Sequence, residues 1–143
     1  MTPDTLKALA RRWIVGIWDH ADFQLFDELA SEQYSYTAPG QGPMSGRAFK
    51  DFVVAARTAF PDLENSIESQ MAEGDVVVTR GTTRGTHLAT FGDLAPTGKS
   101  ITVPWVMFTT FAGGRIVGDS EMYDVLGMMT QLGAVPPSAQ VIT

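Results

Sequence analysis

Apolar side chains in the first sixty residues recur at the spacing of amphipathic helices. The opening Thr2-Pro3-Asp4 combines a capping hydroxyl with an early proline, so a first helix is predicted to begin there. Asp22 and Ser45 are placed to start a second and a third helix, and Pro61 ends the third. The inward stripes of these helices comprise Leu6, Leu9, Trp13 and Ile17, then Phe23, Phe26 and Leu29, then Phe49, Phe52, Val53, Ala56 and Phe60.

From Leu63 onward the period changes from helical to two, which is typical of strands. One side of the first strand carries Leu63, Asn65, Ile67, Ser69 and Met71. Turns and a loop separate the other extended segments, which are predicted at 33–38, 76–87, 100–111 and 115–123, with a loop at 39–43. Three helices followed by four long strands predict an α+β fold. A curved antiparallel sheet wrapped around the helices would leave a concave, apolar pocket for a small molecule.

The composition fits one folded domain. The 143 residues are 44% hydrophobic, enough for one core and too few for two comfortable ones. We therefore expect a domain at 1–134 and a frayed tail at 135–143. No apolar run approaches the roughly 20 residues of a membrane span, and the opening residues lack the pattern of a signal peptide. These features predict a cytoplasmic protein with no membrane partner.

Several kinds of chemistry are disfavoured by the residues that the chain contains. It has no cysteine, which excludes disulfides, thiolate metal sites and cysteine nucleophiles. Its two histidines, His20 and His87, lie far apart, so we expect no metal site and no cofactor. A formal charge of -6 with scattered basic residues opposes binding to nucleic acid. A small molecule is the expected partner.

An acidic run near the C-terminus is the strongest candidate for chemistry. Asp119, Glu121 and Asp124 follow one another within six residues and are flanked by apolar side chains. Strand alternation leaves two orientations open, because the opposite choice would bury Ser120 and Met122 instead. If Glu121 points inward, it shares a face with Val117, Asp119 and Tyr123, and a neighbouring strand can add Trp105, Met107 and Thr109.

The chain also resembles a known family over nearly its whole length. The segments Gly85-Thr-His-Leu-Ala-Thr-Phe-Gly-Asp-Leu-Ala-Pro-Thr-Gly98 and Asp124-Val-Leu-Gly-Met-Met-Thr-Gln-Leu-Gly133 carry the resemblance. Tyr34, Ser45-Gly46-Arg-Ala-Phe49 and Phe60-Pro-Asp-Leu63 stand in register with them. Together they resemble the SnoaL-like polyketide cyclases of the NTF2-like superfamily. That superfamily hosts cyclases, isomerases, epoxide hydrolases, hydroxylases and binding modules on one α+β cone, so function must be argued from the site.

The resemblance implies roles for individual residues. A single carboxylate near the end of the last strand is the acid/base of the polyketide cyclases, and Glu121 stands at that position as Glu rather than Asp. The family pairs it with a histidine on the preceding strand, where this chain has Met107. Trp105 stands where the family can have a polar side chain. The resemblance further implies a homodimer formed through the outer face of the sheet.

These inferences lead to a hypothesis for the site. A lone Glu121 in a pocket shaped by aromatic side chains would be desolvated, which raises its pKa toward neutrality and suits removal of a proton alpha to a carbonyl. The leading hypothesis is a cofactor-independent cyclase of a hydrophobic polyketide-type intermediate. In an alternative that needs no histidine partner, the pocket folds the substrate for a pericyclic closure, and Glu121 polarises the substrate rather than removing a proton. The predicted substrate-binding residues are Trp18, Tyr36, His87, Trp105, Met107 and Tyr123.

Two other functions fit the same sequence, and they differ in where the acidic residues lie. An epoxide hydrolase or isomerase would bring Asp119 or Asp124 into the pocket beside Glu121, and a binding module would keep all its acidic residues outside. We expect Asp124 to cap the last helix, and Asp119 to face solvent or pair with Arg115. For His87, a structural or gating role is favoured over proton transfer.

Overall fold

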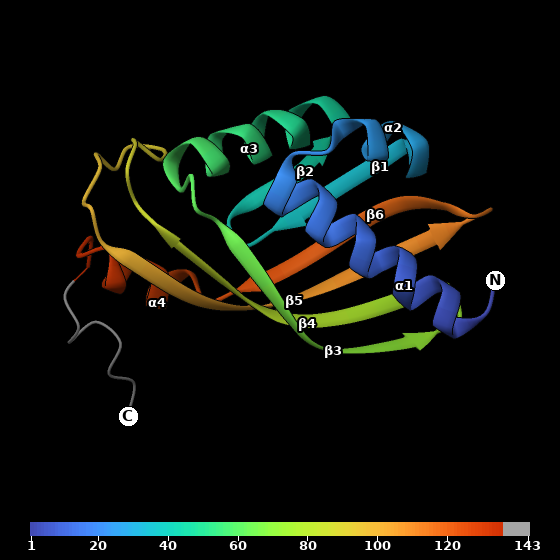
Figure 1. Ribbon diagram of the computed structural model, residues 1–143. Helices are drawn as coiled ribbons and strands as arrows, with labels where there is room; N and C mark the ends of the chain where they lie inside the picture. Colours follow the sequence, from blue (N-terminus) through green and yellow to red (C-terminus); the bar gives the residue numbers. More distant parts are fainter. Residues whose placement is uncertain (136–143) are drawn as a thin grey trace.

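A curved six-stranded sheet with helices across its concave side makes up the computed structural model, which describes residues 1–135 (Figure 1). The helices are α1 (Pro3–Ile14), α2 (Phe23–Leu29), α3 (Gly46–Ala59) and α4 (Val125–Gln131). The strands are β1 (Ala30–Ala38), β2 (Gln41–Ser45), β3 (Glu64–Glu73), β4 (Val76–Thr86), β5 (Ser100–Ala112) and β6 (Arg115–Tyr123). This arrangement confirms the predicted α+β class.

The helix starts follow the capping residues that the sequence offers. The hydroxyl of Thr2 accepts a hydrogen bond from the backbone N–H of Thr5 at 3.1 Å, and the Asp22 carboxylate accepts one from Leu25 at 3.1 Å. Ser45 occupies the cap position of α3 without a side-chain hydrogen bond. A π-helical turn, Val15–Asp19, follows α1 and was not predicted. None of the helices in residues 1–135 has the length and apolar character needed to cross a membrane.

The sheet order is β2-β1-β6-β5-β4-β3, and it corrects two predictions. The strand β1 runs parallel to β6, so the sheet is not wholly antiparallel. The segment expected as a loop at 39–43 contributes most of β2, which pairs with β1 around a turn at Gly40. Pro43 obscured that strand in the sequence, and it is tolerated because β2 lies at the sheet edge.

The orientation of β6 settles the question that alternation left open. Glu121 and Tyr123 line the interior, while Met122 is exposed. Nearer the start of β6, a bulge shifts the register with β5. Thr110 pairs with Gly118, whereas Phe111 pairs with Ile116, so Val117 is the extra residue. The core position predicted for Val117 is therefore taken by its neighbour Ile116, which is fully buried.

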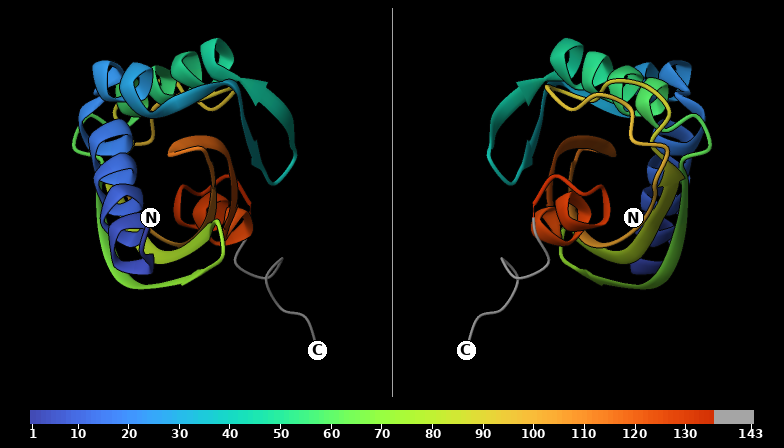
Figure 2. Two further views of the ribbon diagram at one scale, coloured as in Figure 1. Left: turned by 90° about the vertical axis from the view of Figure 1, so that its right-hand side faces the viewer. Right: turned by 90° about the vertical axis from the view of Figure 1, so that its left-hand side faces the viewer.

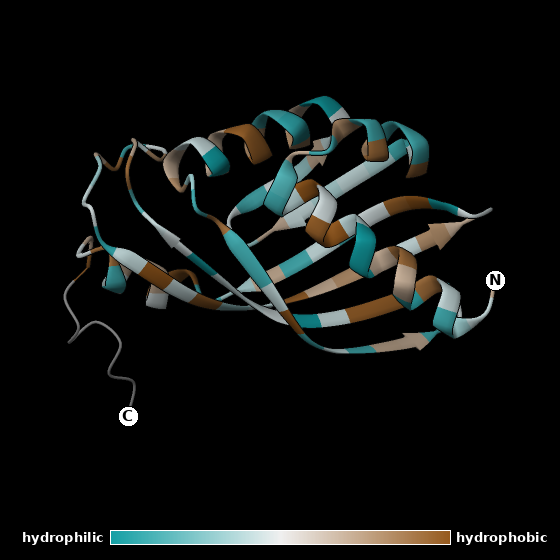
Figure 3. Ribbon diagram, in the orientation of Figure 1, coloured by the Kyte–Doolittle hydropathy of each residue, from teal (hydrophilic) through white to brown (hydrophobic). Residues whose placement is uncertain are grey.

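Two clusters of buried apolar residues lie in the interior, and the partly buried Tyr123 packs against both. End-on views show the strands curving around and α1, α2 and α3 closing the open side (Figure 2). Coloured by hydropathy, the strands alternate between hydrophobic and hydrophilic residues (Figure 3). The main cluster is built around Trp13, Phe26, Tyr36, Phe49 and Met107. Of the predicted tail, 136–143 lies outside the described residues.

Candidate active site

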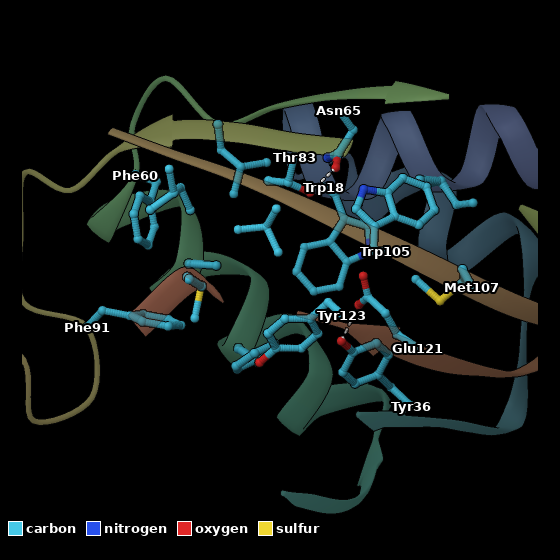
Figure 4. A pocket seen from close by; sticks show the side chains of 17 residues that line it. Trp18, Tyr36, Phe60, Asn65, Thr83, Phe91, Trp105, Met107, Glu121 and Tyr123 are labelled. Carbon is cyan, nitrogen blue, oxygen red and sulfur yellow. Dashed lines mark hydrogen bonds between the residues drawn. The ribbon is translucent and has the colours of Figure 1, made fainter. Parts of the chain in front are cut away.

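A cavity of about 90 Å³ lies between the concave face of the sheet and the helices (Figure 4). Five of the predicted substrate-binding residues line it together with Glu121: Trp18, Tyr36, Trp105, Met107 and Tyr123. The rest of the wall is mainly apolar and comprises Ile14, Phe52, Ala56, Phe60, Leu63, Phe91, Ile101, Val103 and Met128, with Asn65 and Thr83 as polar exceptions. The interior is therefore an apolar chamber with one acidic group, the arrangement expected of a small-molecule site.

Glu121 borders the cavity from β6, two residues before Tyr123. Its Cα partner on β5 is Met107, and the Tyr36 hydroxyl on β1 donates a hydrogen bond to its Oε1 at 2.5 Å. The side chain is partly exposed, and it lines the cavity. Burial raises the pKa of Glu121 to about 7, the Tyr36 hydrogen bond acts in the opposite direction, and the Asp119 charge adds to the rise.

Both protonation states of Glu121 are therefore populated near neutral pH. A carboxyl group in this range can remove a proton from carbon and return it to oxygen in one catalytic cycle. Burial, followed by the charge of Glu121, raises the pKa of Tyr36 above its usual value, so Tyr36 keeps its proton as a donor. Tyr36, predicted as a substrate-binding residue, lines the cavity, and its hydroxyl is hydrogen-bonded to the Glu121 carboxylate.

Asp119 is neither solvent-facing nor paired with Arg115, which corrects the prediction from sequence. It is 3% exposed, and its Oδ2 accepts hydrogen bonds from Trp13 Nε1 at 2.8 Å and from the Tyr34 hydroxyl at 2.7 Å. Its Oδ1 accepts one from the Thr109 hydroxyl at 2.7 Å. The Arg115 guanidinium donates to the carbonyl oxygen of Ala30 instead. Asp119 thus ties α1, β1, β5 and β6 together and does not line the cavity.

Asp124 occupies the helix start where the sequence predicted it. Its Oδ1 accepts a hydrogen bond from the backbone N–H of Gly127 at 2.9 Å, which caps α4. The side chain is exposed and does not line the cavity. Glu121 is therefore the one acidic residue among those that border the chamber in the described part of the chain.

His87 was placed among the substrate-binding candidates, but it does not line the cavity. The ring is fully buried and stacks on Phe60, with centroids 5.2 Å apart, and Phe60 lies on the cavity wall. Its Nδ1 accepts a hydrogen bond from the backbone N–H of Thr97 at 3.2 Å. His87 thereby fixes the base of the loop 88–99, and Phe91 of that loop contributes to the wall.

A polar pair on the cavity wall was not identified from sequence. The Thr83 hydroxyl donates to Asn65 Oδ1 at 2.5 Å, and Asn65 Nδ2 donates to Asp19 Oδ1 at 2.6 Å. A signal for this pair was present, because Asn65 interrupts the apolar face of the strand that begins after Leu63. Asp19 supplied no such signal, because it belongs to the unpredicted π-helical turn.

The amino-acid sequence matches the profile of a known protein family. The sequence profile of the SnoaL-like polyketide cyclases matches residues 8–132. The chain belongs to the SnoaL-like polyketide cyclase family. A search of curated proteins found no significant match.

Solved structures of similar proteins share the fold of this SnoaL-like protein. AclR of Streptomyces galilaeus, a candidate hydroxylase, is 25% identical, with a TM-score of 0.83 over 94% of this chain and 100% of its own. A candidate SnoaL-like polyketide cyclase from Jannaschia sp. CCS1 is 23% identical and has a TM-score of 0.86. The match covers 94% of this chain and 95% of the Jannaschia chain. IdmH of Streptomyces antibioticus, a candidate polyketide cyclase, is 23% identical and has a TM-score of 0.75. The match covers 93% of this chain and 99% of the IdmH chain. Family membership supports a cyclase-type function, and the solved structures show the shared fold.

Proposed function

We propose that this SnoaL-like protein is a cofactor-independent cyclase of a hydrophobic polyketide-type intermediate, with Glu121 as its acid/base. One observation carries the proposal. A single carboxylate borders an apolar cavity, receives a hydrogen bond from Tyr36, and has its pKa raised by burial to about 7. A group of this kind can take up and release a proton at neutral pH without a metal.

The proposed reaction is an intramolecular aldol-type ring closure. The Glu121 carboxylate removes a proton from a carbon alpha to a carbonyl, and the C–H electron pair moves to form an enolate. The enolate carbon attacks a second carbonyl carbon of the same molecule, and the new alkoxide takes the proton back from Glu121. The aromatic walls, Trp18 and Phe52 among them, favour a folded substrate whose two reacting ends lie close together.

The alternatives receive less support from the positions of the acidic residues. Epoxide opening usually needs an acid and a base together, but both Asp119 oxygens already accept hydrogen bonds and Asp124 caps α4 outside the cavity. A pure binding module has no need for a desolvated carboxylate, whose burial costs stability. An isomerase could use Glu121 alone, and it differs from a cyclase in forming no new carbon-carbon bond.

Product analysis tests this proposal directly. Linear poly-β-ketone esters would be incubated with the protein after dialysis against a chelator, and the products characterised by mass spectrometry and NMR. A cyclase gives a product with a new ring carbon-carbon bond and a mass unchanged or lowered by one water. A product with the original carbon skeleton and a shifted double bond would instead identify an isomerase.

The pH dependence of turnover should follow the ionisation of Glu121. Because the base is the deprotonated form, kcat/KM is expected to rise as pH increases and to level off above about 7, where burial holds the pKa. Measurement of kcat/KM between about pH 5 and pH 9 reports the free enzyme. A profile without an inflection near neutrality would contradict Glu121 as the base.

We also propose that the protein is a homodimer that pairs the outer faces of two sheets. Two large apolar side chains lie on that face: Phe108 of β5, 44% exposed, and Met122 of β6, 62% exposed. Phe108→Asp and Met122→Asp should each convert a dimer to a monomer in sedimentation velocity. Val54→Asp, on the exposed side of α3, is the matched control and should leave the dimer intact. A wild-type protein that sediments as a monomer would refute this assignment.

A further inference from the structure

The three tryptophans of this chain differ in what their indole N–H groups contact. Trp13 Nε1 donates to Asp119, and Trp18 is partly exposed at the cavity. Trp105 is 3% exposed, and its Nε1 is buried without a hydrogen-bond partner among the described residues. An unpaired buried donor destabilises the folded protein, so native proteins retain few of them. The Trp105 N–H therefore calls for a functional explanation.

The backbone holds the Trp105 ring in a fixed place on the cavity wall. Trp105 lies between Gly81 of β4 and Tyr123 of β6 in the sheet. A Cβ at Gly81 would collide with Cζ2 and Cε2 of the indole, so the absence of a side chain there makes room for the ring. Glu121 precedes Tyr123 by two residues on the same face of β6.

Trp105 and Glu121 consequently border the same chamber from neighbouring strands. The close-up shows Trp105 between the Asn65–Thr83 pair and Glu121 (Figure 4). The hydroxyl of Thr83 is already engaged with Asn65, and that of Tyr36 with Glu121. Trp105 therefore lines the cavity and carries a buried N–H donor that has no partner among the described residues.

We propose that the Trp105 N–H donates a hydrogen bond to the substrate carbonyl oxygen on which negative charge develops. This inference rests on the proposed cyclase function. When Glu121 takes the proton from the carbon alpha to that carbonyl, the C–H electron pair becomes the enolate double bond and the carbonyl pair moves to oxygen. The Trp105 N–H stabilises that oxygen without losing its own proton. When the new carbon-carbon bond forms, the oxygen becomes a carbonyl again and Glu121 protonates the new alkoxide.

Trp105 stands where the family can have a polar side chain, but its indole is itself a hydrogen-bond donor. Replacement of a polar side chain by Trp105 looks like a loss of hydrogen bonding from sequence alone. An indole supplies one donor and no acceptor, so it favours a carbonyl or enolate oxygen over a hydroxyl that must itself donate. The ligand class assigned to this subsite is therefore a hydrophobic ketone.

A matched pair of ligands tests this assignment without turnover. The probes are 1-tetralone, an aromatic ketone, and tetralin, which has a methylene in place of the carbonyl. In the ¹⁵N-labelled protein, 1-tetralone should move the Trp105 indole proton signal downfield, whereas tetralin should not. Trp105→Phe should reduce the affinity for 1-tetralone relative to tetralin by about fivefold, the effect of one net hydrogen bond of about 1 kcal/mol.

The control is Trp18→Phe, which removes an indole from the same cavity and should leave the ratio of the two affinities unchanged. An unmoved Trp105 signal in wild type at the solubility limit of 1-tetralone overturns the proposal. So does an affinity ratio that is equal in wild type and Trp105→Phe. If that variant does not fold, the wild-type spectra decide the question. Because binding is measured without catalysis, failure here is separate from failure of the cyclase assay.

Discussion

Glu121→Gln is expected to lower the kcat/KM for ring closure by about 10²- to 10⁴-fold, the usual contribution of a positioned acid/base. Glutamine has nearly the same shape, and its carbonyl oxygen can still accept the hydrogen bond from Tyr36. The variant therefore removes proton transfer while preserving the packing of the cavity. Steady-state kinetics on the linear substrate measure this loss. The control is Glu121→Asp, which retains a carboxylate and should keep more activity than Glu121→Gln.

The same substitution should alter stability in a pH-dependent way. In the native state burial raises the pKa of Glu121 from 4.5 to about 7, so between these values the native protein holds a proton that the unfolded chain has released. Wild-type stability should fall as pH increases through this window, by roughly 3 kcal/mol in total. Glu121→Gln has no carboxyl to ionise and does not lose this stability. The excess of its free energy of unfolding over that of wild type should therefore be small at about pH 5 and large at about pH 8.

Urea unfolding at the two pH values measures the difference. Equal effects of Glu121→Gln on stability at both values would show that the carboxyl is not desolvated in the native state. Full turnover by the same variant would eliminate Glu121 as the proton-transfer group. That result would leave a cavity that acts only by folding its substrate for a pericyclic closure.

Asp119→Ala is expected to lower the free energy of unfolding by about 3–5 kcal/mol. The substitution leaves three donors, from Trp13, Tyr34 and Thr109, without an acceptor in a site closed to water. A typical domain is stable by only about 5–15 kcal/mol, so this is a large fraction of the total. Urea denaturation at neutral pH measures the change.

Two control variants separate the hydrogen-bond network from the loss of a carboxylate in general. Asp119→Asn keeps an acceptor oxygen and should destabilise the protein less than Asp119→Ala. Asp124→Ala removes an exposed helix cap and should cost about 1 kcal/mol. If Asp119→Ala costs no more than Asp124→Ala, the buried carboxylate does not stabilise the fold as described.

The elements with strong local signals were predictable from sequence. Thr2 and Asp22 start helices because their side chains bond backbone groups three residues away. The parallel pairing of β1 with β6 carried no such signal, because it joins segments far apart in the chain. The edge strand β2 pairs locally with β1, but Pro43 obscured it in the sequence. The bulge at Val117 carried no local signal, since it exists only relative to β5.

The site shows the same division between local and distant information. Alternation correctly grouped Trp105, Met107 and Glu121 on one face. The expectation that Asp119 faces solvent or pairs with Arg115 was wrong, because its hydrogen-bond partners Trp13 and Tyr34 lie 106 and 85 positions away in the chain. His87 does not line the cavity as a substrate-binding residue would, because its ring stacks on Phe60 and accepts a hydrogen bond from Thr97. These contacts are structural, the kind of role that the sequence favoured for His87.

The parallel pairing of β1 with β6 has a consequence for biosynthesis. Tyr36 and Glu121 are 85 positions apart, and the ribosome makes β6 last among the strands of the sheet. A nascent chain that ends at the β5–β6 turn contains most of the cavity wall but not its carboxylate. Pairing two strands so far apart in the chain is among the slower steps in the folding of a small domain. The chamber therefore gains its acidic group only after the other five strands of the sheet have been synthesised.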